Sequence, residues 1–317
     1  MIQLANIPTG VYKALIILAT LIWGFSFVVM KNVVEVIPPA WLLGIRFTTA
    51  GLILLLILLP RVRKCFSLKI LGAGFLLALF DFSAFWTQTV GLQHTTPGIN
   101  AFLTATYCVI VPFVWWVLAH HRPSLCNLGA AVIALGGIWL VSVSTSGETL
   151  TLGFGEAMTL LCAVLFAIHI ALVSRCSRVH DVLVLTVFQF IGEGLLGLGV
   201  GALTEVPPAL SAITPDIVGS MAFLIVFASI VAFGIQNVAL AHVPPAQAAL
   251  FLSLEAVFGV VFSILLYGEV LTLRLGMGFA LIFVAILVDE LLAPWLEAKR
   301  AIVAQKRKRW KEDEPHV

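Results

Sequence analysis

The chain has 317 residues, of which 61% are hydrophobic and 11% are charged, and its mean hydropathy is +1.11. Soluble globular proteins carry about 25% charged residues, so this composition excludes a soluble fold and indicates that lipid is the solvent. The formal net charge of +2 gives no indication of a nucleic-acid partner.

The chain divides into apolar runs, each close to the ~20 residues that a helix needs to cross a bilayer. In order, the ten runs are Tyr12–Met30, Ala40–Leu59, Ile70–Leu92, Pro97–Ala119, Leu125–Val143, Gly155–Ser174, Val182–Leu203, Ile217–Ala241, Pro245–Tyr267 and Leu271–Leu292. Proline or glycine stands at most breaks between runs, and Pro112 is expected to kink the fourth run. No run alternates apolar and polar residues, so we predict an all-α integral membrane protein with ten transmembrane helices.

The first run is expected to be an uncleaved span, because no basic segment and no small-residue cleavage site come before Lys31. If the N-terminus is cytoplasmic, Lys31 and Arg274 face outward, Arg46 lies inside a span, and the other basic residues are cytoplasmic. These others are Lys13, Arg61, Arg63, Lys64, Lys69, Arg122, Arg175, Arg178, Lys299, Arg300, Lys306, Arg307, Lys308, Arg309 and Lys311. We therefore predict a multi-pass protein of the plasma membrane with both termini in the cytoplasm.

One stretch of the chain is present twice. Residues 84–118 recur as residues 232–266 without a gap, at an offset of 148 positions. The matches include residues that are rare in apolar segments, among them Gln88/Gln236, His94/His242 and Pro97/Pro245. Each copy reads as a helical hairpin, namely an apolar run, a short turn and a second apolar run. The first two spans of each half also align, at an offset of 141, for example Phe25 with Phe166 and Gly51 with Gly192.

Five spans in each half is an odd number, so the second half must enter the membrane from the opposite side. The sequence therefore predicts two inverted five-helix repeats related by a two-fold axis in the membrane plane. We place the first repeat at residues 1–146, the second at 147–293, and a basic cytoplasmic tail at 294–317. Such an antisymmetric pair favours alternating access.

Polar and ionisable side chains inside spans are costly, so we expect them to face a cavity or a partner. The candidate substrate-binding residues are Arg46, Asp81, Trp86, Gln88, Tyr107, Gln236 and Asn237. Arg46 can bind an anionic group through two hydrogen bonds; the alternative is a structural pair with Asp81 or Glu193. The amides can bind amino or carboxyl groups, or they can hold helices together.

Two carboxylates are candidates for ion coupling. Glu193 lies near the middle of its run, as does Glu255. Glu255 belongs to the second copy of the hairpin, and the aligned position of the first copy is Tyr107. This asymmetry marks Glu255 as a hypothetical proton or cation site; the alternative is a structural carboxyl.

The sequence gives little support for an enzyme. Gly192-Glu193-Gly194-Leu195-Leu196-Gly197 fits G-x-G-x-x-G, but it lies inside a span without a preceding strand, and a close-packing helix face explains it better. The chain has no P-loop and no catalytic triad pattern, and we predict no metal site and no cofactor. The cysteines show no metal-binding spacing and are expected to be reduced; they are Cys65, Cys108, Cys126, Cys162 and Cys176.

The chain resembles the EamA family of the drug/metabolite transporter superfamily over roughly residues 14–292. The resemblance rests on Ile22-Trp23-Gly24-Phe25-Ser26-Phe27, Arg46-Phe47, Pro112, Leu254-Glu255-Ala256-Val257-Phe258-Gly259 and Tyr267-Gly268-Glu269-Val270-Leu271-Thr272. Many relatives have Glu-Pro where this chain has Glu255-Ala256, which weakens the argument for a kink there.

The resemblance implies ten helices in two inverted repeats and the transport of small metabolites, often outward, with amino acids and related compounds as the usual suggestion. The expected partners are therefore a small-molecule substrate and the lipid bilayer. Two alternatives stay open, namely a nucleotide-sugar or drug carrier of the same superfamily, and a non-transport membrane protein such as an integral enzyme or receptor.

Overall fold

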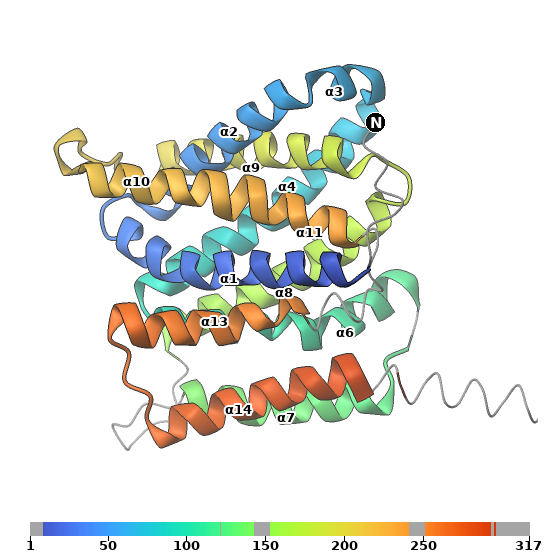
Figure 1. The fold of residues 1–317 in the computed structure, drawn as a ribbon, viewed down its shortest axis with the longest axis vertical. Helices are drawn as coiled ribbons and strands as arrows, with labels where there is room; N and C mark the ends of the chain where they lie inside the picture. Colours follow the sequence, from blue (N-terminus) through green and yellow to red (C-terminus); the bar gives the residue numbers. More distant parts are fainter. Residues whose placement is uncertain (1–8, 121, 143–152, 241–250, 293–294, 296–317) are drawn as a thin grey trace, which may run out of the picture.

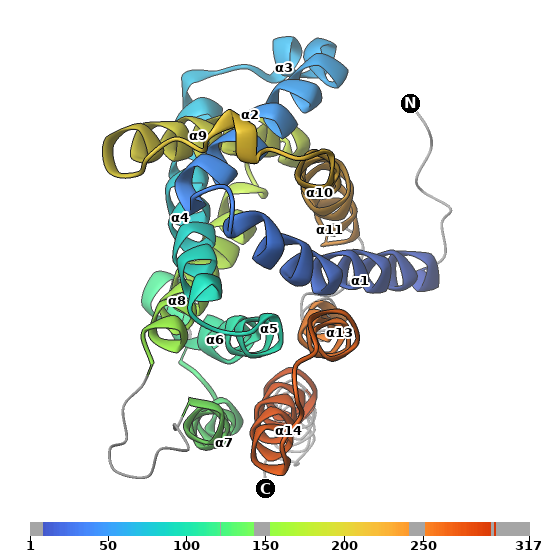
Figure 2. The same ribbon diagram turned by 90° about the vertical axis from the view of Figure 1, so that its left-hand side faces the viewer.

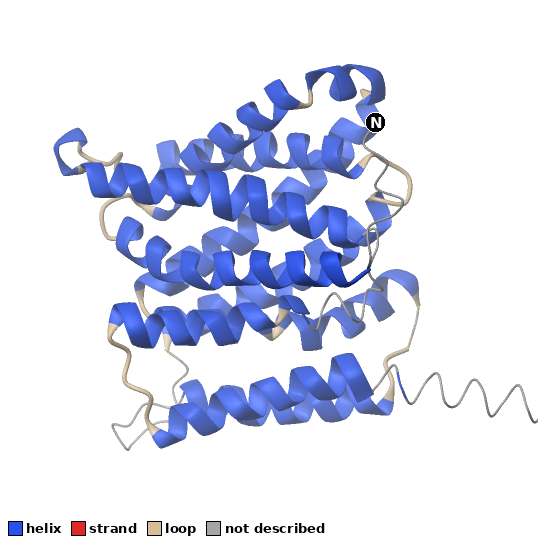
Figure 3. Cartoon of the chain, in the orientation of Figure 1, coloured by secondary structure: helices blue, strands red, loops and turns tan. Residues whose placement is uncertain are grey.

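The computed structural model describes residues 9–120, 122–142, 153–240, 251–292 and 295, and in these ranges every regular element is a helix (Figures 1 and 3). The long helices run side by side across the view of Figure 1. The prediction of an all-α protein is thus confirmed for the described part of the chain.

The first half contains α1 (Thr9–Val34), α2 (Pro39–Ile57), α3 (Leu59–Cys65), α4 (Leu68–Gln93), α5 (Pro97–Ala105), α6 (Tyr107–Ala119) and α7 (Leu125–Ser142). The second half contains α8 (Phe154–Cys176), α9 (Val182–Thr204), η2 (Leu210–Ala212), α10 (Pro215–Phe223), η3 (Leu224–Val231), α11 (Ala232–Leu240), α13 (Leu254–Phe262), η4 (Ser263–Tyr267), α14 (Leu273–Leu287) and η5 (Val288–Leu292). The segments η3, η4 and η5 are π-helical. Because η3 follows α10 and precedes α11 without a gap, these three form one continuous helical stretch.

Seven helical stretches are long and apolar enough to cross a membrane, judged by length and composition. They are Gly10–Val34, Pro39–Ile57, Leu68–Gln93, Pro97–Leu118, Phe154–Cys176, Val182–Thr204 and Pro215–Gln236. Three shorter apolar helices, Leu125–Val141, Leu254–Tyr267 and Leu273–Leu287, fall on three further predicted runs. The chain is an all-helical membrane protein, and the count of ten spans stays a prediction.

Helix starts follow local chemistry that the sequence displays. The first turn of a helix has backbone N–H groups without partners inside the helix, so proline is tolerated there and a hydroxyl is a good cap. At α5, Pro97 stands in the first turn and the Thr96 hydroxyl accepts a hydrogen bond from the Ile99 N–H. The same Thr-Pro pattern starts α10, at Thr214 and Pro215.

The irregularity in the fourth predicted run is not where the proline lies. The helix is interrupted at Thr106, between α5 and α6, whereas α6 continues through Pro112. Both the backbone N–H and the hydroxyl of Thr106 donate to the Leu103 carbonyl, at 3.2 and 2.6 Å. This tight i to i−3 turn accounts for the break without help from proline.

Helices of the two halves pack against each other in pairs. The most extensive pairs are α2 with α9, α4 with α8, α7 with α14 and α4 with α9, and α5 also packs against α13. Figure 2 views several of these helices end-on and shows α7 beside α14 and α5 beside α13. At the crossing of α2 and α9 the backbones nearly touch, since a Cβ added to Gly197 would lie 2.7 Å from the Gly44 Cα.

Candidate functional site

Arg46 lies at the centre of the described helices. Only 1% of Arg46 is exposed, and its Nε donates a hydrogen bond of 2.8 Å to the Ser229 hydroxyl on η3. The guanidinium carbon lies 4.8 Å from the ring centroid of Phe47 and 5.2 Å from that of Phe85. Aromatic faces attract a cation, so these rings stabilise a charge that has no access to water.

A second set of polar side chains faces Asp81 on α4. The Gln189 amide on α9 donates to one Asp81 oxygen at 2.6 Å, and His169 Nδ1 on α8 lies 3.3 Å from the other. Asp81 is fully buried, and His169 is 5% exposed. Three helices therefore converge on one carboxylate, and the Nε2 of His169 has no hydrogen-bond partner among the described residues.

Glu193 lies one helical turn after Gln189 and is fully buried. Its charge interacts with those of Asp81 and Arg46, yet neither carboxylate oxygen accepts a well-formed hydrogen bond in the part of the chain described. Arg46 does not come within ion-pairing distance of either carboxylate; the ion pairs among the described residues are Arg61–Asp181 and His169–Asp81. Neither form of the expected structural pair, Arg46–Asp81 or Arg46–Glu193, is thus formed directly.

A third polar group joins α4, α5, α6 and α13 on the other side of Phe166. The Gln88 amide donates to the Thr104 hydroxyl at 3.1 Å, and the Tyr107 hydroxyl donates to the Glu255 carboxylate. The Phe166 ring lies 5.0 Å from Phe85 and 6.3 Å from Tyr107, measured between centroids. Glu255 is therefore a buried carboxyl with Tyr107 as its partner.

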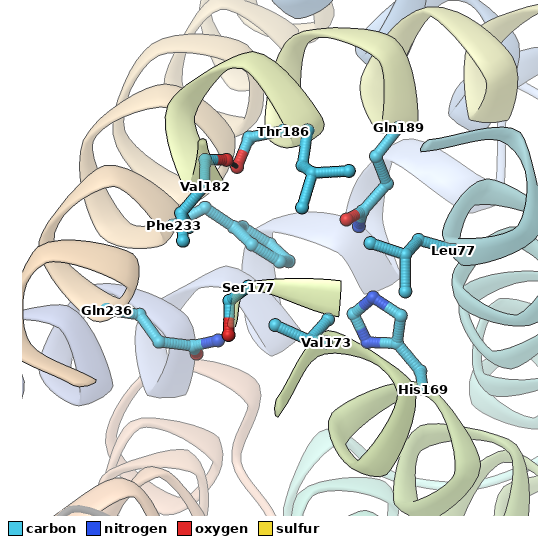
Figure 4. Close-up of a pocket in the computed structure, with 10 residues that line it drawn as sticks. Leu77, His169, Val173, Ser177, Val182, Thr186, Gln189, Phe233 and Gln236 are labelled. Carbon is cyan, nitrogen blue, oxygen red and sulfur yellow. Dashed lines mark hydrogen bonds between the residues drawn. The ribbon is translucent and has the colours of Figure 1, made fainter. Parts of the chain in front are cut away.

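A narrow pocket leads to the polar side chains around Asp81. It is lined by Leu77, His169, Val173, Ser177, Val182, Leu185, Thr186, Gln189, Phe233 and Gln236, and it has room for roughly one water-sized sphere. Figure 4 shows the His169 ring and the Gln189 amide on one side of it and Gln236 on the other. Ser177 follows the last turn of α8 and Val182 begins α9, so the pocket reaches the end of the bundle where these helices are joined.

The opposite end of the bundle is tied together. Lys31 Nζ donates to the carbonyls of Leu92, Gln93 and Thr95, at 2.7, 3.2 and 3.1 Å, where α4 ends. Glu269 accepts hydrogen bonds from the Thr96 hydroxyl at 2.6 Å and from the Gly98 N–H at 3.1 Å, where α5 begins. Charged groups at helix ends complement the unpaired backbone groups, so these contacts hold α1, α4, α5 and the segment after η4 together.

The structure brings some of the predicted site residues together and separates others. Arg46, Asp81 and Glu193 form one cluster, Gln88, Tyr107 and Glu255 belong to another, and Gln236 lines the pocket. Trp86 is partly buried, and its indole N–H has no partner in the described chain. The side chain of Asn237 lies outside the described residues.

Three residues of the cluster are additions to the predicted set, namely His169, Gln189 and Ser229. Signals for two of them were present, because His169 is an ionisable residue inside an apolar run and Ser229 lies at the offset of 148 from Asp81. A polar residue thus occupies the same place in both copies, outside the stretch in which the identical residues match. No sequence signal singles out Gln189, whose partner is 108 residues away.

The helical fold, the apolar exterior and a buried polar site between the two halves define a multi-pass membrane transporter. The chain belongs to the EamA-like transporter family, which matches residues 12–143 and again residues 153–288. This is a family of the drug/metabolite transporter superfamily, whose members are typically not enzymes.

Individual relatives agree with this assignment. An uncharacterized transporter of Archaeoglobus fulgidus is 28% identical over 274 residues, which cover 86% of this chain and 84% of the relative. The uncharacterized inner membrane transporter YedA of Escherichia coli is 26% identical over 297 residues, with 90% and 92% covered. A crystal structure with 17% identity superposes with a TM-score of 0.65 over 91% of this chain and 99% of the other, which shows a shared fold.

Proposed function

We propose that this protein is a secondary transporter or facilitator that exports small metabolites, with amino acids or related compounds as the substrate class. Transport would proceed by alternating access between two inverted five-helix repeats, residues 1–146 and 147–293, with residues 294–317 as a cytoplasmic tail. The plasma membrane would hold ten spans, with both chain termini in the cytoplasm.

The contacts between the halves support the inverted arrangement. A two-fold axis brings equivalent elements together, and α2/α9, α5/α13 and α7/α14 are such pairs in chain order. The polar contacts follow the same rule. Asp81 on α4 pairs with α9, and its counterpart Ser229 on η3 pairs with α2.

The observation that carries the proposal is the buried set of charges where the repeats meet, in which Arg46 forms no direct ion pair with Asp81 or Glu193. Arg46 offers a cation to a substrate carboxylate, and the carboxylates of Asp81 and Glu193 offer anions to an ammonium group. A zwitterion supplies both charges at once, which suits a site that holds both. In lipid, such groups are retained mainly where they serve a pathway or a partner.

The other candidate residues are assigned to different parts of the transport path. Gln236 and Asn237 would line the cytoplasmic entrance, since Gln236 borders the pocket. Trp86, Gln88 and Tyr107 would line the path on the far side of Phe85. Glu193 and Glu255 both stay candidates for coupling, and each has polar side chains beside it.

The two ends of the bundle support a state closed to the outside. The ties made by Lys31 and Glu269 lie at the predicted external end, and the pocket lies at the predicted cytoplasmic end. An alternating-access carrier in this state would receive a substrate from the cytoplasm. The relative YedA carries the name of an inner membrane transporter, which agrees with the proposed location.

Counterflow in proteoliposomes tests the function. Vesicles loaded with one unlabelled amino acid at a time are diluted into the same labelled compound, and the expected result is transient accumulation for a subset. Arg46→Gln should abolish it, whereas Arg61→Gln should not, because Arg61 forms an exposed ion pair with Asp181. Counterflow of nucleotide sugars or cationic drugs in place of amino acids would contradict the substrate class, and none at all would contradict transport.

A further inference from the structure

The Asp81 cluster holds more negative than positive charge. Asp81 and Glu193 are carboxylates, Arg46 is the cation that faces them, and His169 is uncharged unless it is protonated. Tyr107 and Glu255, from α6 and α13, form a separate group with its own carboxylate, and Cys162 on α8 lies between the two groups. With both carboxyls ionised and a neutral His169, the cluster would be one positive charge short of balance.

His169 is placed to supply the missing charge. Its Nδ1 faces Asp81 at 3.3 Å, so in the neutral ring the proton belongs on Nδ1, where it can be donated to the carboxylate. The Nε2 is then a bare acceptor, and it has no partner among the described residues although the side chain is buried. Among these residues there is also no group of three or more His, Cys, Asp or Glu side chains able to hold a metal ion.

The pocket lies beside the His169 ring. His169 and Gln189 line the pocket that extends to Ser177 and Val182 at the ends of α8 and α9, and Figure 4 shows the ring at the pocket. Nε2 itself is buried. The predicted cytoplasmic end is thus the side from which we expect a proton to reach the ring, through movement of the pocket wall.

We propose that the His169–Asp81 pair is the proton-binding site of the transport cycle, loaded through the pocket at the cytoplasmic end. A proton from water binds Nε2, and the Nδ1 proton stays directed at Asp81, so the ring becomes a cation and offsets one of the two carboxylate charges. Gln189 holds the other Asp81 oxygen and fixes the carboxylate against the ring. The proton leaves when the repeats rock and the site opens to the other side. This last step rests on the proposed function, whereas proton binding itself does not.

The first test needs no substrate. Protein labelled with ¹⁵N-histidine is purified in detergent, and the His169 signals are assigned by their loss in His169→Gln. We expect a ring protonated only on Nδ1 at high pH that gains a second proton reversibly between about pH 8 and pH 5. A His169 ring that keeps one protonation state over this range would overturn the proposal.

The second test separates proton coupling from transport. Proteoliposomes are prepared with the labelled amino acid that shows the largest counterflow, with and without an imposed pH gradient. Wild type should accumulate the label in response to the gradient, whereas His169→Gln should lose a larger share of this response than of its counterflow. His180→Gln, at a histidine beyond the last turn of α8, should behave as wild type. Counterflow in wild type without any response to the gradient would overturn the coupling role while leaving the proposed function intact.

Discussion

Phe85 and Phe233 occupy the same place in the two copies of the duplicated hairpin, and in the folded chain their rings face each other. Their centroids are 6.2 Å apart and the ring planes are inclined by 51°. Each ring also meets α2 or α9, since Phe85 lies 5.2 Å from Phe47 and Phe233 lies 5.4 Å from Phe190. Two positions that are equivalent in sequence thus meet at the junction of the halves, which a two-fold axis through this point would explain.

This relationship predicts an energetic coupling between the two rings. Aromatic pairs contribute about 0.5–1.5 kcal/mol beyond their buried area. In a cycle of Phe85→Leu, Phe233→Leu and the double variant, the double variant should be less destabilised than the sum of the single ones by that amount. Thermal unfolding in detergent measures the three changes. Strict additivity would mean that the rings do not touch in the folded protein.

Arg46 is predicted to stabilise the folded protein because its charge compensates the carboxylates that it faces. Arg46→Met leaves Asp81 and Glu193 buried without a cation, and breaking a buried charge arrangement costs about 3–5 kcal/mol. Ser229→Ala removes only one hydrogen bond and should cost about 0.6–1.7 kcal/mol. Thermal unfolding of purified variants compares the two.

The charge explanation has its own control. Adding Glu193→Gln to Arg46→Met removes one of the uncompensated carboxylates and should recover part of the lost stability. If the double variant is less stable than Arg46→Met alone, Arg46 stabilises the protein through packing rather than through charge.

The sequence displays the long-range organisation well. A duplicated hairpin with glutamine, histidine and proline in register is unusual in apolar segments, so it identifies two related halves. Helix starts can be predicted equally well from the sequence, because Pro97 and Pro215 belong to local Thr-Pro caps that need no tertiary contact. These features are encoded within a few residues or by self-comparison of the chain.

The residues that make up the buried cluster are harder to predict from the sequence. Arg46 and Asp81 attract notice because charged residues in apolar runs are rare, but their partners are found only after the helices pack. Arg46 donates to a residue 183 positions away, and Asp81 accepts from one 108 positions away. The break at Thr106 was missed for the opposite reason, since proline is the stronger local signal and here it does not interrupt α6.

The inverted arrangement makes a topological prediction at a pair of equivalent positions. Leu68 begins α4 and Asp216 lies in the first turn of α10, at the offset of 148, and both are exposed. In a background without other cysteines, Leu68→Cys should react with an impermeant maleimide only from the cytoplasm and Asp216→Cys only from outside. Labelling of both from the same side would exclude inverted repeats.

Lys31 is predicted to hold the external end closed. Lys31→Met removes three hydrogen bonds to carbonyls at the end of α4. Hydrogen bonds to charged groups contribute about 1.5–3 kcal/mol each, and every 1.4 kcal/mol of lost closure raises the open population about tenfold. The reporter is Thr159→Cys, at a fully buried position near the start of α8. Its modification from outside should become at least several-fold faster in Lys31→Met and stay unchanged in Lys64→Met, where the lysine is exposed on α3.

The crossing of α2 and α9 gives a matched pair of glycine substitutions on one helix. A Cβ at position 197 would meet the backbone of Gly44, whereas a Cβ at position 199 would meet nothing within 4 Å. Overpacking costs about 1–3 kcal/mol, so Gly197→Ala should lower the thermal stability. Gly199→Ala should leave it unchanged or raise it by up to about 1 kcal/mol, because alanine favours the helix. Equal stability of the two variants would show that α2 and α9 do not approach through Gly44 and Gly197, and the junction between the halves would then have to lie elsewhere.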